Sequence, residues 1–175
     1  MKLLAFDTSS KTLSLAILED RELLAQTTLN IKKNHSISLM PAIDFLMASL
    51  DLKPMDLDRI VVSQGPGSYT GLRIAVATAK TLAYTLKIEL VGVPSLLALV
   101  PEKTEGLVIP LINARRNNVY AGFYRSGQAV RSEEHLSFAD VLEIAGATDQ
   151  PITFVGETEA FAEQIEAALP QATIQ

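Results

Sequence analysis

The chain has 175 residues, of which 48% are apolar and 20% are charged, a balance that excludes disordered and fibrous proteins. Its formal charge of −5 gives it no electrostatic means of holding a nucleic acid unaided. The chain has no cysteine, which excludes disulfides, thiolate metal sites and thiol nucleophiles. It also lacks a signal-peptide pattern and any apolar stretch near twenty residues, so we expect a cytoplasmic protein with no membrane contact.

The first part of the chain predicts three consecutive strands and then alternating helices and strands. Residues 12–19 alternate between apolar and other residues, the period of a strand with one buried face. Pro41 interrupts the next apolar run, so we expect the helix there to begin near Ser38. The predicted elements are strands at 2–8, 12–19 and 23–30, a helix at 38–50, a strand at 59–64, a helix at 70–86, a strand at 89–93 and a short helix starting at 94.

The second part of the chain repeats this order of elements. Residues 101–106 have the composition of a linker, so we place a domain boundary between residues 103 and 104. The repetition indicates an α/β protein built from two copies of one mixed-sheet unit, at 1–103 and 104–175. We expect the second copy to be truncated, without a closing strand and helix. Its predicted elements are strands at 107–112, 119–124 and 128–133, a helix at 138–145, a strand at 152–155 and a helix at 157–169.

A glycine-containing turn joins the strand at 59–64 to the helix that follows it. Backbone N–H groups freed by glycine, together with a helix N-terminus, could bind a phosphate. The alternative is a tight structural turn capped by Ser68 or Thr70, which is favoured because no Walker-type lysine follows. The candidate phosphate-binding residues are Gly65, Gly67, Ser68 and Thr70.

Asp7 ends the first predicted strand and is a candidate for the same phosphate site. A carboxylate at the carboxyl end of a central strand can serve metal or phosphate chemistry. The alternative, which we favour, is that Asp7 caps the turn into the second strand with its own side chain.

The remaining polar candidates do not form a metal site. His35 and His135 each stand without a second ligand at suitable spacing, so we expect a capping or surface role for both. Arg115 and Arg116 form a basic pair that could hold a phosphate or a partner's carboxylate, although a solvated turn is at least equally consistent with the sequence. We therefore expect no metal and no cofactor.

The helices at 38–50 and 70–86 carry more apolar residues than one buried face needs. A helix that is apolar over most of its circumference must be covered on two sides. The cover could be a well-packed interior or, as we favour, another chain. The candidate partner-binding residues are Leu39, Met40, Ile43, Met47, Leu72, Arg73, Val76, Ala79, Lys80 and Ala83.

Five motifs, in order over nearly the whole chain, resemble the TsaB (YeaZ) family. They are Phe6-Asp7-Thr8-Ser9, the string from His35 to Ile43, Gly65 to Arg73, Gly92-Val93-Pro94-Ser95-Leu96, and Ala114-Arg115-Arg116-x-x-Val119-Tyr120. The resemblance implies an actin-like (ASKHA) fold of two ribonuclease-H-like lobes. It also implies a part in forming threonylcarbamoyladenosine (t6A) next to the anticodon of tRNAs that read codons beginning with A.

The resemblance further implies a subunit that is not itself catalytic. In this family the catalyst is the paralogue TsaD, whose metal is held by two histidines four residues apart, whereas Ser95 and Leu99 stand at the matching positions here. Asn113 also replaces an aspartate usual in the family. The implied partners are TsaD, bound directly through the two apolar helices, and a TsaE-type ATPase and tRNA, both met only through the complex. Alone, the chain would form a homodimer.

A rival function from another class is a small actin-like ATPase or kinase. It would use Asp7 and the turn from Gly65 to Gly71 to bind the nucleotide phosphates.

Overall fold

The computed structural model describes residues 1–30 and 35–175, which divide into two compact units, Met1–Ser95 and Leu96–Gln175. The boundary lies before the position expected from the linker composition at 101–106. The reason is that Leu96 is fully buried in a cluster with Val108, Tyr124 and Val155 of the second unit. Helix α3 (Ser95–Ala98) therefore contributes the side chains of Leu96 and Leu97 to the core of the second unit.

The first unit contains a five-stranded sheet in the order β3-β2-β1-β4-β5. β1 pairs antiparallel with β2 and parallel with β4, so the sheet is mixed, as the sequence predicted. The strands are β1 (Lys2–Asp7), β2 (Thr12–Glu19), β3 (Glu22–Asn30), β4 (Arg59–Ser63) and β5 (Glu89–Val93).

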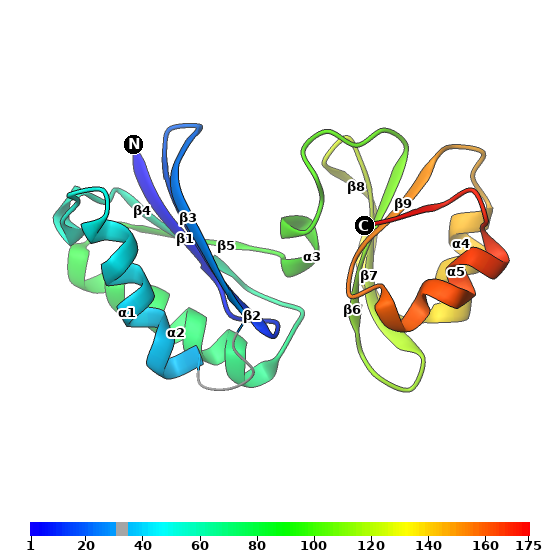
Figure 1. Ribbon diagram of the computed structural model, residues 1–175, viewed down its shortest axis with the longest axis horizontal. Helices are drawn as coiled ribbons and strands as arrows, with labels where there is room; N and C mark the ends of the chain where they lie inside the picture. The colour runs from blue at the N-terminus through cyan, green and yellow to red at the C-terminus, as the bar shows by residue number, and fades with distance from the viewer. Residues whose placement is uncertain (31–34) are drawn as a thin grey trace. The chain divides into compact units, whose positions relative to one another are not determined.

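Helices α1 (His35–Ala48) and α2 (Tyr69–Leu86) lie beside each other on one face of this sheet (Figure 1). α1 begins three residues before the predicted Ser38 and contains Pro41 within it. The sheet presents alternate apolar side chains to both helices, and Leu4 and Ile60 are completely buried there. Each such side chain stabilises the fold by about 1.5–3 kcal/mol.

The second unit repeats the same topology, with a sheet in the order β10-β9-β6-β7-β8. β6 pairs antiparallel with β7 and parallel with β9, as β1 does with β2 and β4. The strands are β6 (Leu107–Asn113), β7 (Asn118–Arg125), β8 (Gln128–Ser137), β9 (Ile152–Gly156) and β10 (Thr173–Ile174). The expectation that the second unit lacks a closing strand is wrong, because β10 pairs parallel with β9.

Helices α4 (Phe138–Gly146) and α5 (Ala162–Ala168) cover one face of the second sheet (Figure 1). The rings of Phe138 and Phe161 lie 4.3 Å apart between centroids and fill much of the space beneath the helices. The predicted helix at 157–169 is shorter than expected, because a separate 3-10 turn (Glu159–Phe161) precedes α5. A further 3-10 turn, at Pro54–Asp56, was not predicted.

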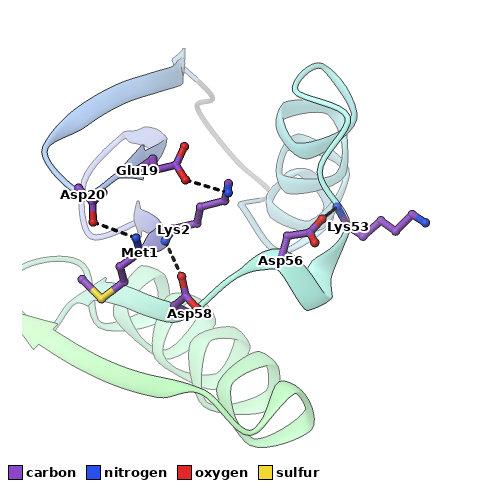
Figure 2. Close-up of polar contacts among 7 residues, drawn as sticks. All are labelled: Met1, Lys2, Glu19, Asp20, Lys53, Asp56 and Asp58. Atoms are coloured by element: carbon purple, nitrogen blue, oxygen red, sulfur yellow. Dashed lines mark hydrogen bonds and ion pairs between the residues drawn. The ribbon is translucent and has the colours of Figure 1, made fainter.

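Polar contacts hold the start of β1 to the elements beside it (Figure 2). The Met1 amine lies 2.8 Å from Asp20 Oδ1 in the β2–β3 turn, and Lys2 Nζ lies 2.9 Å from Glu19 Oε1. The backbone N–H of Lys2 donates to Asp58 Oδ2 at 2.6 Å. These contacts lie at the end of β1 opposite Asp7.

Candidate partner-binding site

The turn before α2 is packed against the turn between β1 and β2. A Cβ on Gly71 would lie 1.9 Å from the carbonyl oxygen of Thr8, and one on Gly67 would lie 2.7 Å from that of Ser9. Thr8 Oγ1 donates to the carbonyl oxygen of Gly71 at 2.7 Å, and the N–H of Ser68 donates to that of Ser9 at 2.6 Å. Glycine is needed here because protein backbone occupies the space beside it.

The start of α2 is satisfied by its own residues. Ser68 is the N-cap and accepts a hydrogen bond from the N–H of Gly71 at 3.3 Å, as one of the two sequence alternatives predicted. The carbonyl oxygen of Gly65 accepts from the N–H of Ser95 at 2.8 Å, and Thr70 is exposed. These contacts favour the structural turn over a phosphate site.

Asp7 also makes the contacts of a turn residue. Its Oδ1 accepts from the N–H of Ser9 at 2.7 Å and its Oδ2 from the Ser9 hydroxyl at 2.9 Å. The Ser9 hydroxyl in turn lies 3.5 Å from that of Ser95, which is hydrogen-bonded to the Ser63 hydroxyl. A chain of hydroxyl groups thus links Asp7 to the carboxyl end of β4, and Ser95 belongs to it.

The ten candidate partner-binding residues divide into three sets by exposure. Arg73, Lys80 and Met40 are exposed, whereas Leu72 and Val76 are partly buried. The other five lie in the core of the first unit, so their side chains do not face solvent, and their assignment to a partner surface is corrected. They are Leu39, Ile43, Met47, Ala79 and Ala83.

Large apolar side chains nevertheless stand on the outer faces of both helices. On α1, Ile37 and Phe45 are each 69% exposed. On α2, Tyr69 and Tyr84 are 74% and 88% exposed. We call these four residues, with Met40, the helix face. The sequence prediction omitted the four, although side-chain size was an available guide: bulky residues do not fit where α2 presents Gly71 and alanines to the sheet.

Basic groups accompany the helix face on α2. The guanidinium of Arg73 lies 5.4 Å from the centroid of the Tyr69 ring, a cation–π contact that holds the ring in place. Tyr84 and Lys80 line an open groove of ≈ 560 Å³ next to β5. The other lining residues are Thr81, Ala83, Ile88 and Leu90.

The turn between β6 and β7 has an unusual backbone. Arg115, Arg116 and Asn117 are consecutive and all left-handed, with φ of 67°, 52° and 57°. This conformation costs a residue with a side chain on the order of 1 kcal/mol. Asn113 Oδ1 accepts from the N–H of Arg115 at 2.8 Å, a bond that an aspartate at this position could also accept.

Two further findings concern the chemistry of the described residues. Within 1–30 and 35–175, no three His, Asp or Glu side chains group as metal ligands would. His35 instead contacts the carbonyl oxygen of Ser10 at 3.1 Å through Nε2, and His135 is exposed. No helix in the described part of the chain is long and apolar enough to cross a bilayer.

The two sheets and their helices define an actin-like fold. A solved Bacteroides thetaiotaomicron protein, described as having an actin-like ATPase fold and unknown function, matches 99% of this chain and 90% of its own with a TM-score of 0.55 at 8% identity. The structure described as YeaZ from Pseudomonas aeruginosa is more similar, with a TM-score of 0.81 and 28% identity over 93% of this chain and 79% of its own. The chain therefore has an actin-like fold.

Sequence relatives narrow this class to one family. Residues 22–175 match the family model described as TsaD, tRNA N6-adenosine threonylcarbamoyltransferase. The Bacillus subtilis protein named tRNA threonylcarbamoyladenosine biosynthesis protein TsaB is 42% identical over 94% of this chain and 75% of its own length. A Buchnera aphidicola protein of the same name is 31% identical over 70% of this chain and 60% of its own. The chain belongs to the TsaB (YeaZ) family, a relative of TsaD.

Proposed function

We propose that the chain acts in tRNA threonylcarbamoyladenosine biosynthesis as a non-catalytic subunit that binds a TsaD-type paralogue through the helix face. Family membership supports the pathway. The observation that carries the mode of action is the set of five large apolar side chains exposed on α1 and α2, since such clusters mark protein interfaces.

The composition of the helix face fits a protein partner. Tyrosine, methionine, phenylalanine and arginine are the residues enriched in the centres of interfaces. Phe45 and Met40 would supply apolar contact area on α1, while Tyr84 and the Tyr69–Arg73 pair would supply anchors on α2. Without the paralogue, a second copy of the chain would cover the same surface.

The non-catalytic role is supported by the contacts of the residues that a rival catalytic function would use. Asp7 receives both of its described hydrogen bonds from Ser9, and the glycines of the next turn are packed against Thr8 and Ser9. The Ser95 hydroxyl is buried and bonded to Ser63. Each of these groups already has a structural task, so the reaction would be left to the partner.

The proposal is tested by changing Phe45 to Asp and measuring affinity for the TsaD paralogue by calorimetry. A buried aromatic anchor contributes enough that its loss should weaken binding by at least about tenfold. The melting temperature should stay close to that of the parent chain, because Phe45 is 69% exposed in the free protein.

Met55→Asp is the matched control, since Met55 is 77% exposed in the same unit but lies outside α1 and α2. It should bind the paralogue as the parent does. Equal affinity of the Phe45→Asp variant would refute the helix face as the binding surface. Full t6A formation by the paralogue without this chain would refute the subunit role.

A further inference from the structure

The proposed subunit role does not use the basic turn between β6 and β7. Arg115 and Arg116 are exposed, and in the part of the chain that the structure describes their guanidinium groups have no hydrogen bond or ion pair. This is unexpected, because residues 96–175 hold eleven Asp and Glu against five Lys and Arg. Arg131 in the same unit does pair, with Glu134 at 3.0 Å.

The turn is held in its strained shape by bonds to its backbone. Asn118 Nδ2 donates to the carbonyl oxygens of Arg115 at 3.4 Å and Arg116 at 3.1 Å. Asn117 accepts from the N–H of Phe138 at 2.9 Å and from Gln164 Nε2 at 3.1 Å. Glycine would adopt these φ values without strain, so the two arginine side chains serve a purpose that the turn itself does not require.

An aromatic pair lies close to the turn along β7. Tyr120 is 37% exposed and follows Asn117 by three residues. Its direct partner on β8 is His135, whose ring contacts it edge-on at 5.2 Å between centroids. The His135 ring thus supports the Tyr120 ring from the neighbouring strand. Exposed aromatic rings that can stack on bases, next to guanidinium groups that can bind phosphates, are the means by which proteins hold unpaired RNA.

We propose that Arg115, Arg116 and Tyr120 contact the phosphates and a base of an unpaired RNA segment. The acidic charge around them, including Asp140 and Glu157 near the turn, repels a polyanion at longer range. The contact is therefore weak in the free chain and adds to affinity when a partner holds the RNA. The proposal rests on the assignment to tRNA modification and not on which surface binds the paralogue.

The test measures binding of an unmodified tRNA transcript to the full chain with its TsaD paralogue, by fluorescence anisotropy between 50 and 200 mM salt. Arg115→Gln/Arg116→Gln should weaken binding by about tenfold and lower the slope against log salt by about 1.4, which is about 0.7 for each phosphate of an unpaired strand that the variant no longer binds. Tyr120→Leu should weaken binding several-fold at an unchanged slope, because stacking releases no counterions.

Two glycine variants distinguish the effect of losing the arginine side chains from the effect of relieving backbone strain. Arg115→Gly/Arg116→Gly should raise the melting temperature and still weaken RNA binding. Ser126→Gly relaxes the left-handed residue of the β7–β8 turn, where φ is 50°, and should raise the melting temperature with RNA affinity unchanged.

Chromatography of the same variants with the paralogue distinguishes this proposal from the subunit proposal, because loss of the complex is then seen directly. Unchanged tRNA affinity in the double glutamine variant would overturn the proposed RNA contact. The proposal would also be overturned if the complex of the parent chain with its paralogue did not bind tRNA. Loss of paralogue binding with tRNA affinity intact would instead assign the arginines to carboxylates of the partner.

Discussion

The two units share one strand order but differ in what their helices present. α1 and α2 have 14 and 18 residues and carry five large exposed apolar side chains. α4 and α5 have 9 and 7 residues, all in the described part of the chain, and carry none. Formal charge differs too: residues 1–95 hold ten basic and nine acidic side chains, while residues 96–175 have a net charge of −6. The two units therefore share their topology and differ in the chemistry of their surfaces.

The two units also fill the gap between helix and sheet differently. In the first unit α2 presents Gly71, Ala75, Ala79 and Ala83 to the strands. In the second, the Phe138 ring occupies the space under α4 and contacts Phe161. The first unit should accordingly tolerate enlargement of helix residues worse than the second, a difference that substitutions can measure.

Gly71→Ala should give the largest effect of such substitutions. Its new methyl group would meet the Thr8 carbonyl at 1.9 Å, and backbone cannot move aside as a side chain can. We expect the free energy of unfolding to fall by about 3 kcal/mol or more, measured by urea denaturation.

Gly146→Ala is the matched substitution in the second unit. A Cβ there lies 3.7 Å from Leu169 Cδ2, an ordinary contact at the end of α4. Stability should change by less than about 0.5 kcal/mol. Similar losses for both variants would show that the packing difference between the units has no energetic consequence.

Removing the helix caps should give a smaller effect that is nearly equal in the two units. Ser68 accepts from the N–H of Gly71 at 3.3 Å, and Ser137 accepts from that of Asp140 at 3.2 Å. Ser68→Ala and Ser137→Ala should each cost about 1 kcal/mol by denaturation. A markedly larger loss for Ser68 would mean that its turn supports more than the start of α2.

The smallest expected effects on stability come from exposed charged pairs. One such pair in each unit has a shifted pKa, and the two shifts make stability depend on pH in opposite directions. The hydrogen bond to Asp20 raises the pKa of the Met1 amine above its usual 8.0, so its contribution is complete below pH 8 and is lost as pH rises through the folded value. The hydrogen bond from Arg131 lowers the pKa of Glu134 below 4.5, so that contribution is lost as pH falls.

NMR titration of both groups measures these shifts. Asp20→Asn should return the amine pKa toward 8.0 and leave the Glu134 carboxyl as it was. An amine pKa that does not respond to this substitution would contradict the contact seen in Figure 2.

The strands were predicted well where the pattern was regular. Residues 12–19 and 89–93 match β2 and β5 because alternation or a short bounded apolar run identifies a strand. β10 was missed because its two residues are too few to show a period. The start of α1 was misplaced because Pro41 was expected within the first turn, whereas the helix extends six residues before it.

The helix surface was only partly predictable. The sequence identified α1 and α2 as too apolar for one buried face, but it could not tell which side the sheet takes. The distance between α2 and the sheet decides which side of the helix faces the strands. This distance is short at the start of α2, where Thr8 and Ser9 contact the turn that precedes the helix. The small residues Ala75, Ala79 and Ala83 consequently face the sheet, and Tyr69 and Tyr84 face outward.

The alanine row of α2 gives the outer surface of that helix an unusual freedom to diverge. The buried residues of the helix are Gly71, Ala75, Ala79 and Ala83, and the exposed Tyr69 and Tyr84 take no part in the core. Outward positions can then be exchanged with little disturbance of the sheet. Proteins that descend from one ancestor could in this way evolve different binding partners while they keep the same core.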